Sequence, residues 1–300
     1  MSDRLRVHGA LLAAAVFFSL NYIVSKKTMG LITPITFAWL RVAGAAIVLN
    51  LLPREHTPLT RADERQLVLY ALLAVAINQT LFLGGLSLTS AHLAAIIIGT
   101  IPLFTLGAAI AIGRERATAA KLVGIALAAA GAFLVVGVEG FEGSRRSLAG
   151  TLMLLGNSFS YALYLVLSKP MMARVSARRA LARMFAWATL LLVPVAIVPM
   201  LREPWATIPP RAWLGLLFVI ALPTIGAYLL NAWALARADS SIVAAYTYVQ
   251  PVLTALLAAI FLGERIGIAA VAAAAMIFTG LWLASRYQLR SQVHQPPPIG

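Results

Sequence analysis

Cysteine is absent from the sequence, and this absence sets the first limits on what the chain can be. Without a thiol there is no disulfide, no thiol nucleophile and no cysteine-ligated metal. Histidine is also scarce, with four residues among 300, and the sequence has no cluster of histidines and acids of the kind that ligates a metal. We therefore expect neither a metal nor any other cofactor.

Charged residues are also scarce in the sequence. Charged residues make up 11% of the chain, whereas ordinary soluble domains have about a quarter. Hydrophobic residues reach 61% and the mean hydropathy is +0.88, which is more apolar surface than a soluble core of this length can bury. The composition excludes a soluble enzyme and predicts an all-α polytopic membrane protein, because a helix crosses the hydrocarbon with about 20 apolar residues.

Apolar runs separated by charged, Pro-rich or Gly-rich punctuation predict ten transmembrane helices. Two arginines precede the first run, as in a signal peptide, but Lys26 and Lys27 follow it without a small-residue cleavage site, so we expect an uncleaved first span. Residues 286–300, with three consecutive prolines, are predicted to be a disordered cytoplasmic tail. The predicted spans are 7–26, 33–52, 66–86, 91–112, 118–138, 148–168, 180–200, 212–235, 240–262 and 267–285.

The distribution of lysine and arginine predicts the orientation. With the N-terminus in the cytoplasm, the cytoplasmic loops hold most of the basic residues, as the positive-inside rule requires. We therefore expect a multi-pass protein of the bacterial inner membrane with both termini cytoplasmic. The net charge is +14, but the basic residues are scattered at helix ends rather than clustered with aromatics. We expect a monomer whose partners are the lipid bilayer and a small molecule, and no nucleic acid.

The two halves of the sequence resemble each other. Pro102 matches Pro251, and Glu115 and Arg116 match Glu264 and Arg265, at one constant spacing. We interpret residues 1–145 as a first five-helix repeat (spans 1 to 5) and residues 146–285 as a second (spans 6 to 10). Because five is odd, the second copy enters the membrane from the opposite side. Such inverted repeats are typical of alternating-access transporters, whose site lies at the midplane between repeats.

Residues 90–95, Pro102 and 113–116, with counterparts at 239–244, Pro251 and 262–265, resemble the drug/metabolite transporter superfamily, EamA type. The resemblance covers nearly the whole chain. Within the superfamily the chain is most similar to YddG-type exporters of aromatic and other neutral amino acids. First-span positions that often carry tryptophan in these relatives hold Phe17 and Phe18 here. The resemblance implies ten spans and amino-acid export by alternating access.

Polar and aromatic side chains inside the spans are candidates for the substrate site, because polar groups are costly there. Amide and phenol groups suit a small zwitterion with a neutral side chain. The same groups would also serve as interhelical hydrogen bonds that hold the bundle together. The candidate substrate-binding residues are Phe17, Asn21, Asn78, Phe82, Asn157, Tyr161, Tyr164, Tyr246, Tyr248 and Gln250, and Tyr228 and Asn231 add polar groups to the eighth span.

Two prolines and one arginine inside the spans have structural and functional interpretations. Pro102 and Pro251 remove backbone hydrogen bonds, so they are candidate hinges, and simple packing kinks are the alternative. Arg41 either binds a carboxylate or snorkels to the interface. Its match to Arg183, near the start of a later span, favours a structural role.

The ten acidic residues all fall at span ends or in loops. Proton-coupled carriers usually hold a carboxylate near the midplane, so we expect export without obligatory proton coupling. An intramembrane enzyme, a passive channel and a small-residue scaffold are rival classes; no nucleophile with an adjacent base stands out, and we expect no enzyme. The alternative within the superfamily is a carrier of drugs, nucleotide sugars or other metabolites.

Overall fold

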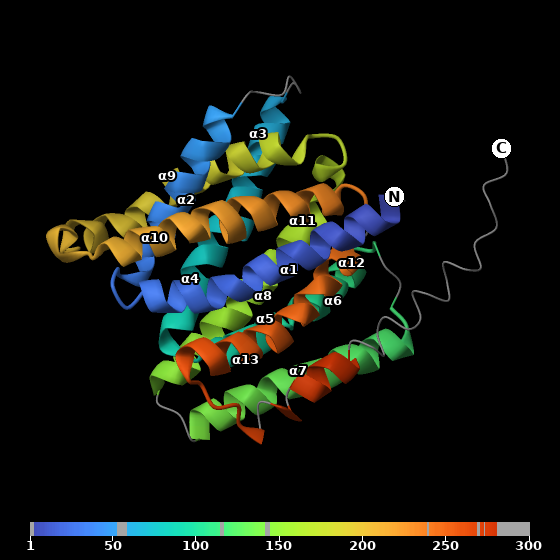
Figure 1. Ribbon diagram of the computed structural model, residues 1–300. Helices are drawn as coiled ribbons and strands as arrows, with labels where there is room; N and C mark the ends of the chain where they lie inside the picture. Colours follow the sequence, from blue (N-terminus) through green and yellow to red (C-terminus); the bar gives the residue numbers. More distant parts are fainter. Residues whose placement is uncertain are drawn as a thin grey trace.

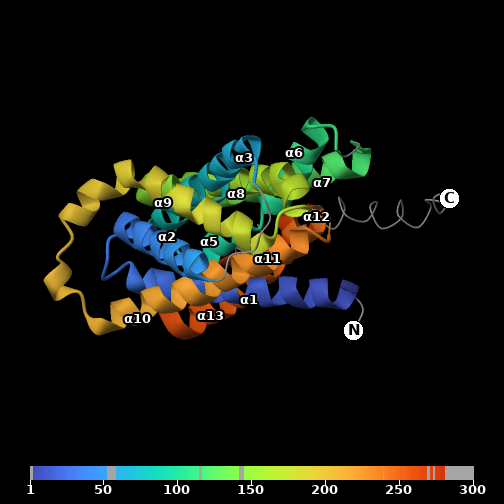
Figure 2. The same cartoon turned by 90° about the horizontal axis from the view of Figure 1, so that it is seen from above.

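The residues that the computed structural model describes are 3–52, 59–114, 117–141, 145–238, 240–268, 271–272 and 274–280, and their regular structure is entirely helical. Figure 1 shows the long helices side by side in one bundle, with α7 at its lower edge. Seen from above, the connection between α9 and α10 lies at the end of the bundle away from the N-terminus (Figure 2). The predicted all-α fold is confirmed.

The helices follow one another without strands along the described residues. Two π-helical segments, η1 (Leu72–Ile77) and η3 (Ile220–Gly226), and two 3-10 turns, η2 (Trp205–Thr207) and η4 (Tyr246–Tyr248), interrupt them. The α-helices are α1 (Asp3–Thr28), α2 (Pro34–Leu51), α3 (Arg61–Ala71), α4 (Asn78–Leu88), α5 (Ala91–Ile98), α6 (Ile101–Ala111), α7 (Ala119–Phe141), α8 (Arg145–Met172), α9 (Ala177–Leu201), α10 (Pro210–Val219), α11 (Ala227–Leu235), α12 (Ser240–Ala245) and α13 (Val249–Leu262).

Eight helical segments within the described residues are long and apolar enough to cross a membrane. They correspond to predicted spans 1 to 4 and 6 to 9, with the third lengthened to Arg61–Leu88 and the sixth to Arg145–Met172. The predicted fifth span lies along α7, where Ala119–Gly131 forms a shorter apolar helix. Of the predicted tenth span, residues 267–268, 271–272 and 274–280 are described, and 274–280 are helical, whereas the predicted tail lies wholly outside the described residues.

The outer surface of the bundle is apolar. On α9, Leu190 is 61% exposed and Leu201 is 79% exposed. Contiguous apolar surface of this kind is rare on soluble monomers, but it is what lipid-facing helices need, because the hydrocarbon offers no hydrogen bonds to polar groups. The chain is a multi-pass membrane protein.

The two halves interrupt their spans at corresponding places. The π-helical segment η1 separates α3 from α4, and η3 separates α10 from α11. Likewise a break after Ile98 divides α5 from α6, and η4 divides α12 from α13. Pro102 lies in the first turn of α6 and Pro251 in the first turn of α13, where a missing N–H costs no helical bond. The structure thus differs from the sequence interpretation, in which these prolines removed hydrogen bonds from continuous spans.

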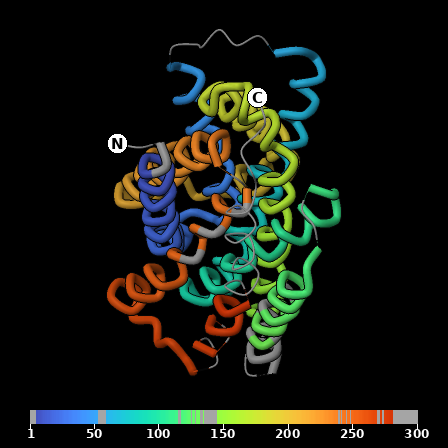
Figure 3. The backbone as a smooth tube through the Cα atoms, turned by 90° about the vertical axis from the view of Figure 1, so that its right-hand side faces the viewer, coloured from blue at the N-terminus to red at the C-terminus, as the bar shows by residue number. Residues whose placement is uncertain are grey.

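Helices from the two halves of the sequence interleave in the bundle. α2 packs on α9, α4 packs on α8, and α1 lies against α11 and α13. Figure 3 looks along the bundle from the end where the N-terminus lies and shows the blue and teal first-half helices beside the yellow and orange second-half helices. The centre of the bundle is therefore built by both halves, and any site there joins them.

Close contact between α4 and α8 depends on two glycines. A Cβ at Gly150 would lie 2.9 Å from Leu88 Cβ and 3.0 Å from the carbonyl oxygen of Gly85. We expect Gly150→Ala to cost about 1–3 kcal/mol of stability, because the helices must move apart. Gly107→Ala on α6 is the control: its Cβ meets nothing within 4 Å, and alanine favours a helix by about 1 kcal/mol. Thermal unfolding midpoints of the purified variants test this, and equal midpoints would contradict it.

Candidate functional site

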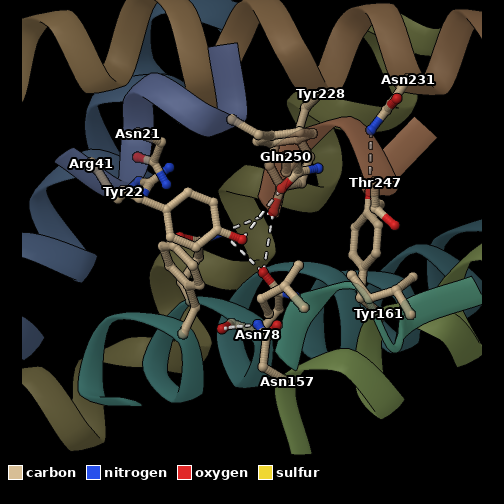
Figure 4. Close-up of a pocket in the computed structure, with 15 residues that line it drawn as sticks. Asn21, Tyr22, Arg41, Asn78, Asn157, Tyr161, Tyr228, Asn231, Thr247 and Gln250 are labelled. Carbon is tan, nitrogen blue, oxygen red and sulfur yellow. Dashed lines mark hydrogen bonds between the residues drawn. The ribbon is translucent and has the colours of Figure 1, made fainter. Parts of the chain in front are cut away.

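A small cavity of about 60 Å³ lies in the middle of the bundle, between the two halves. Figure 4 shows its polar residues pointing toward one another from several helices. The lining residues are Phe18, Asn21, Tyr22, Arg41, Asn78, Gln79, Phe82, Ile98, Ile101, Asn157, Tyr161, Tyr228, Asn231, Thr247 and Gln250.

Tyr228 of α11 is the centre of the largest hydrogen-bond network in this cavity. Its hydroxyl accepts a hydrogen bond from Gln79 Nε2 at 2.8 Å and lies 3.3 Å from Asn78 Oδ1. Gln79 Nε2 also donates to Asn78 Oδ1 at 3.1 Å, and Asn157 Nδ2 donates to the carbonyl oxygen of Asn78 at 2.8 Å. The network joins α4, α8 and α11, so helices of both halves hold one set of amides and a phenol.

The two π-helical segments supply partners for cavity residues. Tyr228 donates to the carbonyl oxygen of Ala74 in η1 at 3.1 Å. Thr224 in η3 donates to Val219, five residues earlier, at 2.7 Å, and its Oγ1 accepts from Arg41. π-helical turns are rare and occur frequently at functional sites. The two matching turns therefore supply polar partners to cavity residues in both halves.

Arg41 of α2 is 1% exposed and lies in the cavity wall. Its Nε and Nη2 donate to Thr224 Oγ1 at 3.1 and 2.8 Å. Its Nη1 is buried without a hydrogen-bond partner among the described residues, and so is Gln79 Oε1. A buried charge without a counter-ion is expensive. The cavity therefore has a positive end that no described carboxylate neutralises.

Two further pairs span the cavity. Tyr22 of α1 donates to Gln250 Oε1 of α13 at 3.3 Å. Asn231 of α11 donates to the hydroxyl of Tyr161 of α8 at 3.3 Å. Both distances are longer than the usual range for such bonds, about 2.5–3.2 Å. These amides and phenols are therefore weakly paired and available to a ligand.

A second polar cluster lies at the face of the bundle where α1 ends, here called the opposite face. Gly263, with φ +65°, turns the chain after α13 in a conformation that favours glycine. Glu264 then accepts hydrogen bonds from the backbone N–H groups of Ala91 and His92, at 2.9 and 3.2 Å, and lies 2.8 Å from His92 Nδ1. Lys26 donates to main-chain carbonyls at the end of α4.

Glu264 thus caps helix α5 of the first half from the second half. Burial would raise the pKa of its carboxyl, but the hydrogen bonds from the His92 side chain and the two backbone N–H groups outweigh this and lower the pKa. The carboxylate therefore stays ionised at neutral pH. A negative charge at the start of a helix also interacts favourably with the helix dipole.

Ion pairs lie at the other face, where α1 begins, here called the N-terminal face. Glu64 of α3 binds Arg183 of α9 in a two-point contact at 2.9 and 3.1 Å, and Trp187 Nε1 donates to the same carboxylate at 3.0 Å. Asp63 pairs with Arg174. These contacts tie α3 to the loop before α9 and to α9 itself.

Six of the predicted substrate-binding residues line the cavity: Asn21, Asn78, Phe82, Asn157, Tyr161 and Gln250. Phe17, Tyr164 and Tyr246 are not in its wall. The Tyr164 ring packs behind Tyr161, with centroids 5.5 Å apart, and Tyr246 hydrogen-bonds His8. Tyr248 lies in η4, and its side chain is outside the described part of the chain. Whether any of these side chains binds substrate stays a prediction.

Sequence reasoning did not select several lining residues, among them Phe18, Tyr22, Arg41, Gln79 and Thr247. Arg41 had a signal, because an arginine inside an apolar span marks a functional site by default. No such signal marked Gln79. In a regular helix it would not share a face with its neighbour Asn78, because residues i and i+1 point in different directions. Tyr22 and Gln79 both adjoin a residue that was selected, Asn21 and Asn78.

Comparison with known proteins gives the same architecture. A solved crystal structure with 19% sequence identity superposes with a TM-score of 0.68, over 98% of this chain and 100% of that one, so the two share a fold. A probable amino-acid metabolite efflux pump of Salmonella typhimurium is 27% identical over 91% of this chain and 92% of its own length. Its namesake from Escherichia coli is 25% identical over the same shares.

An uncharacterized transporter of Archaeoglobus fulgidus is 32% identical over 60% of this chain and 62% of its own length. The model of the EamA-like transporter family matches this sequence twice, over residues 6–137 and 148–286. Together the two matches take up nearly the whole sequence. The chain therefore belongs to the EamA-like transporter family and is a membrane transporter rather than an enzyme.

Proposed function

We propose that this transporter exports amino acids, with aromatic and other neutral side chains, by alternating access. The observation that carries the proposal is the central cavity, whose amides and phenols come from both halves of the chain. Such groups hydrogen-bond a zwitterion without requiring a charged side chain, and the aromatic rings suit an apolar one. The names of the two efflux-pump relatives support the same substrate class.

Alternating access would use the two halves as moving units. In this proposal, residues 1–145 and 146–285 are inverted five-helix repeats, and Pro102 and Pro251 mark the breaks about which spans 4 and 9 rock. The matching interruptions in the two halves support this, because discontinuous helices commonly form transporter sites. Both termini would lie in the cytoplasm of a bacterium, with the protein in the inner membrane.

Counterflow in proteoliposomes tests the function directly. Vesicles containing purified protein are loaded with unlabelled amino acids, and uptake of labelled phenylalanine, tryptophan, threonine and methionine is measured. We expect saturable uptake that exceeds uptake by protein-free vesicles. Folded protein that gives no counterflow with any of the four would overturn the amino-acid proposal and favour another metabolite of the superfamily.

Gln250→Ala should raise the KM for counterflow at least about tenfold. The amide is 4% exposed, lines the cavity and pairs with Tyr22, and a lost hydrogen bond to a charged ligand group costs about 1.5–3 kcal/mol. Gln66→Ala, at an exposed position of α3, is the matched control and should leave KM unchanged. A wild-type KM for the Gln250 variant would remove this residue from the site.

Transport should not require a proton gradient. The cavity wall contains no carboxylate among the described residues, so no acid is placed there to carry a proton. A pH jump across the vesicle membrane, at zero amino-acid gradient, is therefore expected to drive no accumulation of labelled phenylalanine. Accumulation that a protonophore abolishes would refute this part of the proposal.

A further inference from the structure

We propose that Arg41 selects substrates by their carboxylate and that Gln79 receives their ammonium group, so that the cavity accepts free amino acids and rejects amines and esters. This rests on the amino-acid export proposed above and adds the two contacts that would hold the charged ends. Arg41 is thereby a specificity-determining residue rather than a structural one.

The guanidinium of Arg41 is held in place by hydrogen bonds, and one of its nitrogens is left without a partner among the described residues. Thr224 Oγ1 accepts from Nε and Nη2, at 3.1 and 2.8 Å, while Nη1 has no partner among the described residues and is fully buried. Thr224 in turn is anchored to Val219 at 2.7 Å. The donor is therefore oriented before any ligand arrives, which lowers the entropic cost of binding.

The four acids whose side chains the structure describes are committed to other partners. Asp63 pairs with Arg174, Glu64 with Arg183, and Glu264 with His92. Glu203 accepts from the N–H and hydroxyl of Thr33 at the start of α2. Among the side chains that the structure describes, none supplies a counter-ion to Arg41, so a carboxylate brought by the substrate is the complement that the site lacks.

Comparison of the two halves points the same way. Arg183, the counterpart of Arg41, holds the Glu64 carboxylate in a two-point contact at 2.9 and 3.1 Å. The position corresponding to Glu64 is Ala206 at the spacing that relates Arg41 to Arg183 and Trp213 at the spacing that relates Pro102 to Pro251, and neither residue is acidic. One arginine thus has a carboxylate from its own chain, and its counterpart in the cavity wall has none among the described side chains.

Gln79 offers the complementary group. Its Nε2 donates to Asn78 Oδ1 at 3.1 Å and to Tyr228 at 2.8 Å, which determines the orientation of the amide. Its Oε1 is buried, 3% of the residue being exposed, and has no partner among the described residues. A free acceptor in the wall that also holds a free cationic donor matches the two ends of a zwitterion.

Competition against labelled phenylalanine in counterflow tests the assignment with three compounds: phenylalanine, 3-phenylpropionate, which lacks the amine, and phenethylamine, which lacks the carboxylate. We expect wild-type protein to prefer phenylalanine over both. Arg41→Gln should raise the KM for phenylalanine at least about tenfold, as expected for a charge-assisted hydrogen bond, and abolish the preference over phenethylamine. Gln79→Met should abolish the preference over 3-phenylpropionate only.

Thermal unfolding separates this role from a structural one. If Arg41 waits for a substrate carboxylate, Arg41→Gln removes an unpaired buried charge, so the ligand-free midpoint stays level or rises and phenylalanine no longer raises it. Arg183→Gln is the matched control, which should lower the midpoint and keep the ligand preference. A lower midpoint for Arg41→Gln with an unchanged ligand preference would overturn the proposal.

The outcomes also separate this inference from the proposed function. Phenylalanine counterflow with unchanged selectivity in Arg41→Gln would leave amino-acid export standing and refute the role of Arg41. Counterflow of 3-phenylpropionate that depends on Arg41, without any for amino acids, would refute amino-acid export and the role of Gln79 and support the carboxylate contact. If none of the three compounds raises the unfolding midpoint or is transported, both proposals are wrong.

Discussion

Glu264→Gln is expected to raise the accessibility of the central cavity from the opposite face by about tenfold or more. The carboxylate joins the end of α13 to the start of α5 through two backbone N–H groups and the His92 side chain. An amide cannot accept all three, and hydrogen bonds to charged groups are worth about 1.5–3 kcal/mol. Since 1.4 kcal/mol is a factor of ten in an equilibrium, the open population should increase accordingly.

The chain has no cysteine, so a single Ile98→Cys in the cavity wall reports this opening through its labelling by a membrane-impermeant maleimide. We expect faster labelling only from the face at which α1 ends. Glu64→Gln, which weakens the pair with Arg183 at the N-terminal face, is the matched control. This variant should not speed labelling from the face at which α1 ends. Equal labelling rates for Glu264→Gln and wild type would show that this contact does not hold the face closed.

The same contact has a defined pH dependence. Because hydrogen bonds lower the pKa of Glu264 in the folded protein, its contribution is present above the ordinary pKa of glutamate and is lost as the pH falls through the lowered value. Titration of Glu264 therefore contributes nothing to labelling at neutral pH, and it opens the face only in acid below the usual glutamate range.

Tyr228→Ala should destabilise the protein by about 3–5 kcal/mol, as large-to-small changes of buried aromatic residues do. The ring packs edge-on against Phe18, Tyr161 and Phe185. Tyr228→Phe keeps these contacts but leaves Gln79 Nε2 with one acceptor fewer and the Ala74 carbonyl without its donor. We expect this variant to fold, to lose about 1–3 kcal/mol and to have a KM raised about tenfold, because the Gln79 amide loses its orientation.

Tyr70→Phe is the matched control for the hydroxyl. Tyr70 is also buried, and it donates one hydrogen bond, to the carbonyl of Leu167 at 2.9 Å, outside the cavity. It should lose a similar amount of stability with no change in KM. Unfolding midpoints and counterflow kinetics measure the two effects separately, and a wild-type KM in Tyr228→Phe would contradict the role of this network.

The sequence predicted the fold well because the membrane restricts it. Lipid offers no hydrogen bonds, so an apolar run of sufficient length becomes a helix whatever surrounds it. Helical spacing also placed Asn157 and Tyr161 on one face of α8, and both line the cavity. The same spacing placed Tyr164 with them, and the structure puts its ring one layer behind, because the width of the face that reaches the cavity depends on the neighbouring helices.

Other features of the site depend on tertiary packing. Asn78 and Gln79 both reach the cavity directly after the π-helical segment η1, which regular helical spacing does not anticipate. Glu264 was recognisable as a residue at a tight turn, but its contact with the start of α5 joins residues far apart in the chain. Arg41 was interpreted as structural because of its counterpart Arg183, and the difference between them appears only when their partners are seen.

By itself, then, the sequence determined that the chain is an all-helical membrane protein made of two similar halves, because hydropathy and repetition are properties of the residues in order. Tertiary structure decided which polar groups meet. Whether an arginine is paired or free depends on which helix lies opposite it, and here Arg183 faces Glu64 whereas Arg41 faces Thr224 and the cavity. Whether each arginine is paired is therefore determined by helix packing, which brings together residues far apart in the sequence.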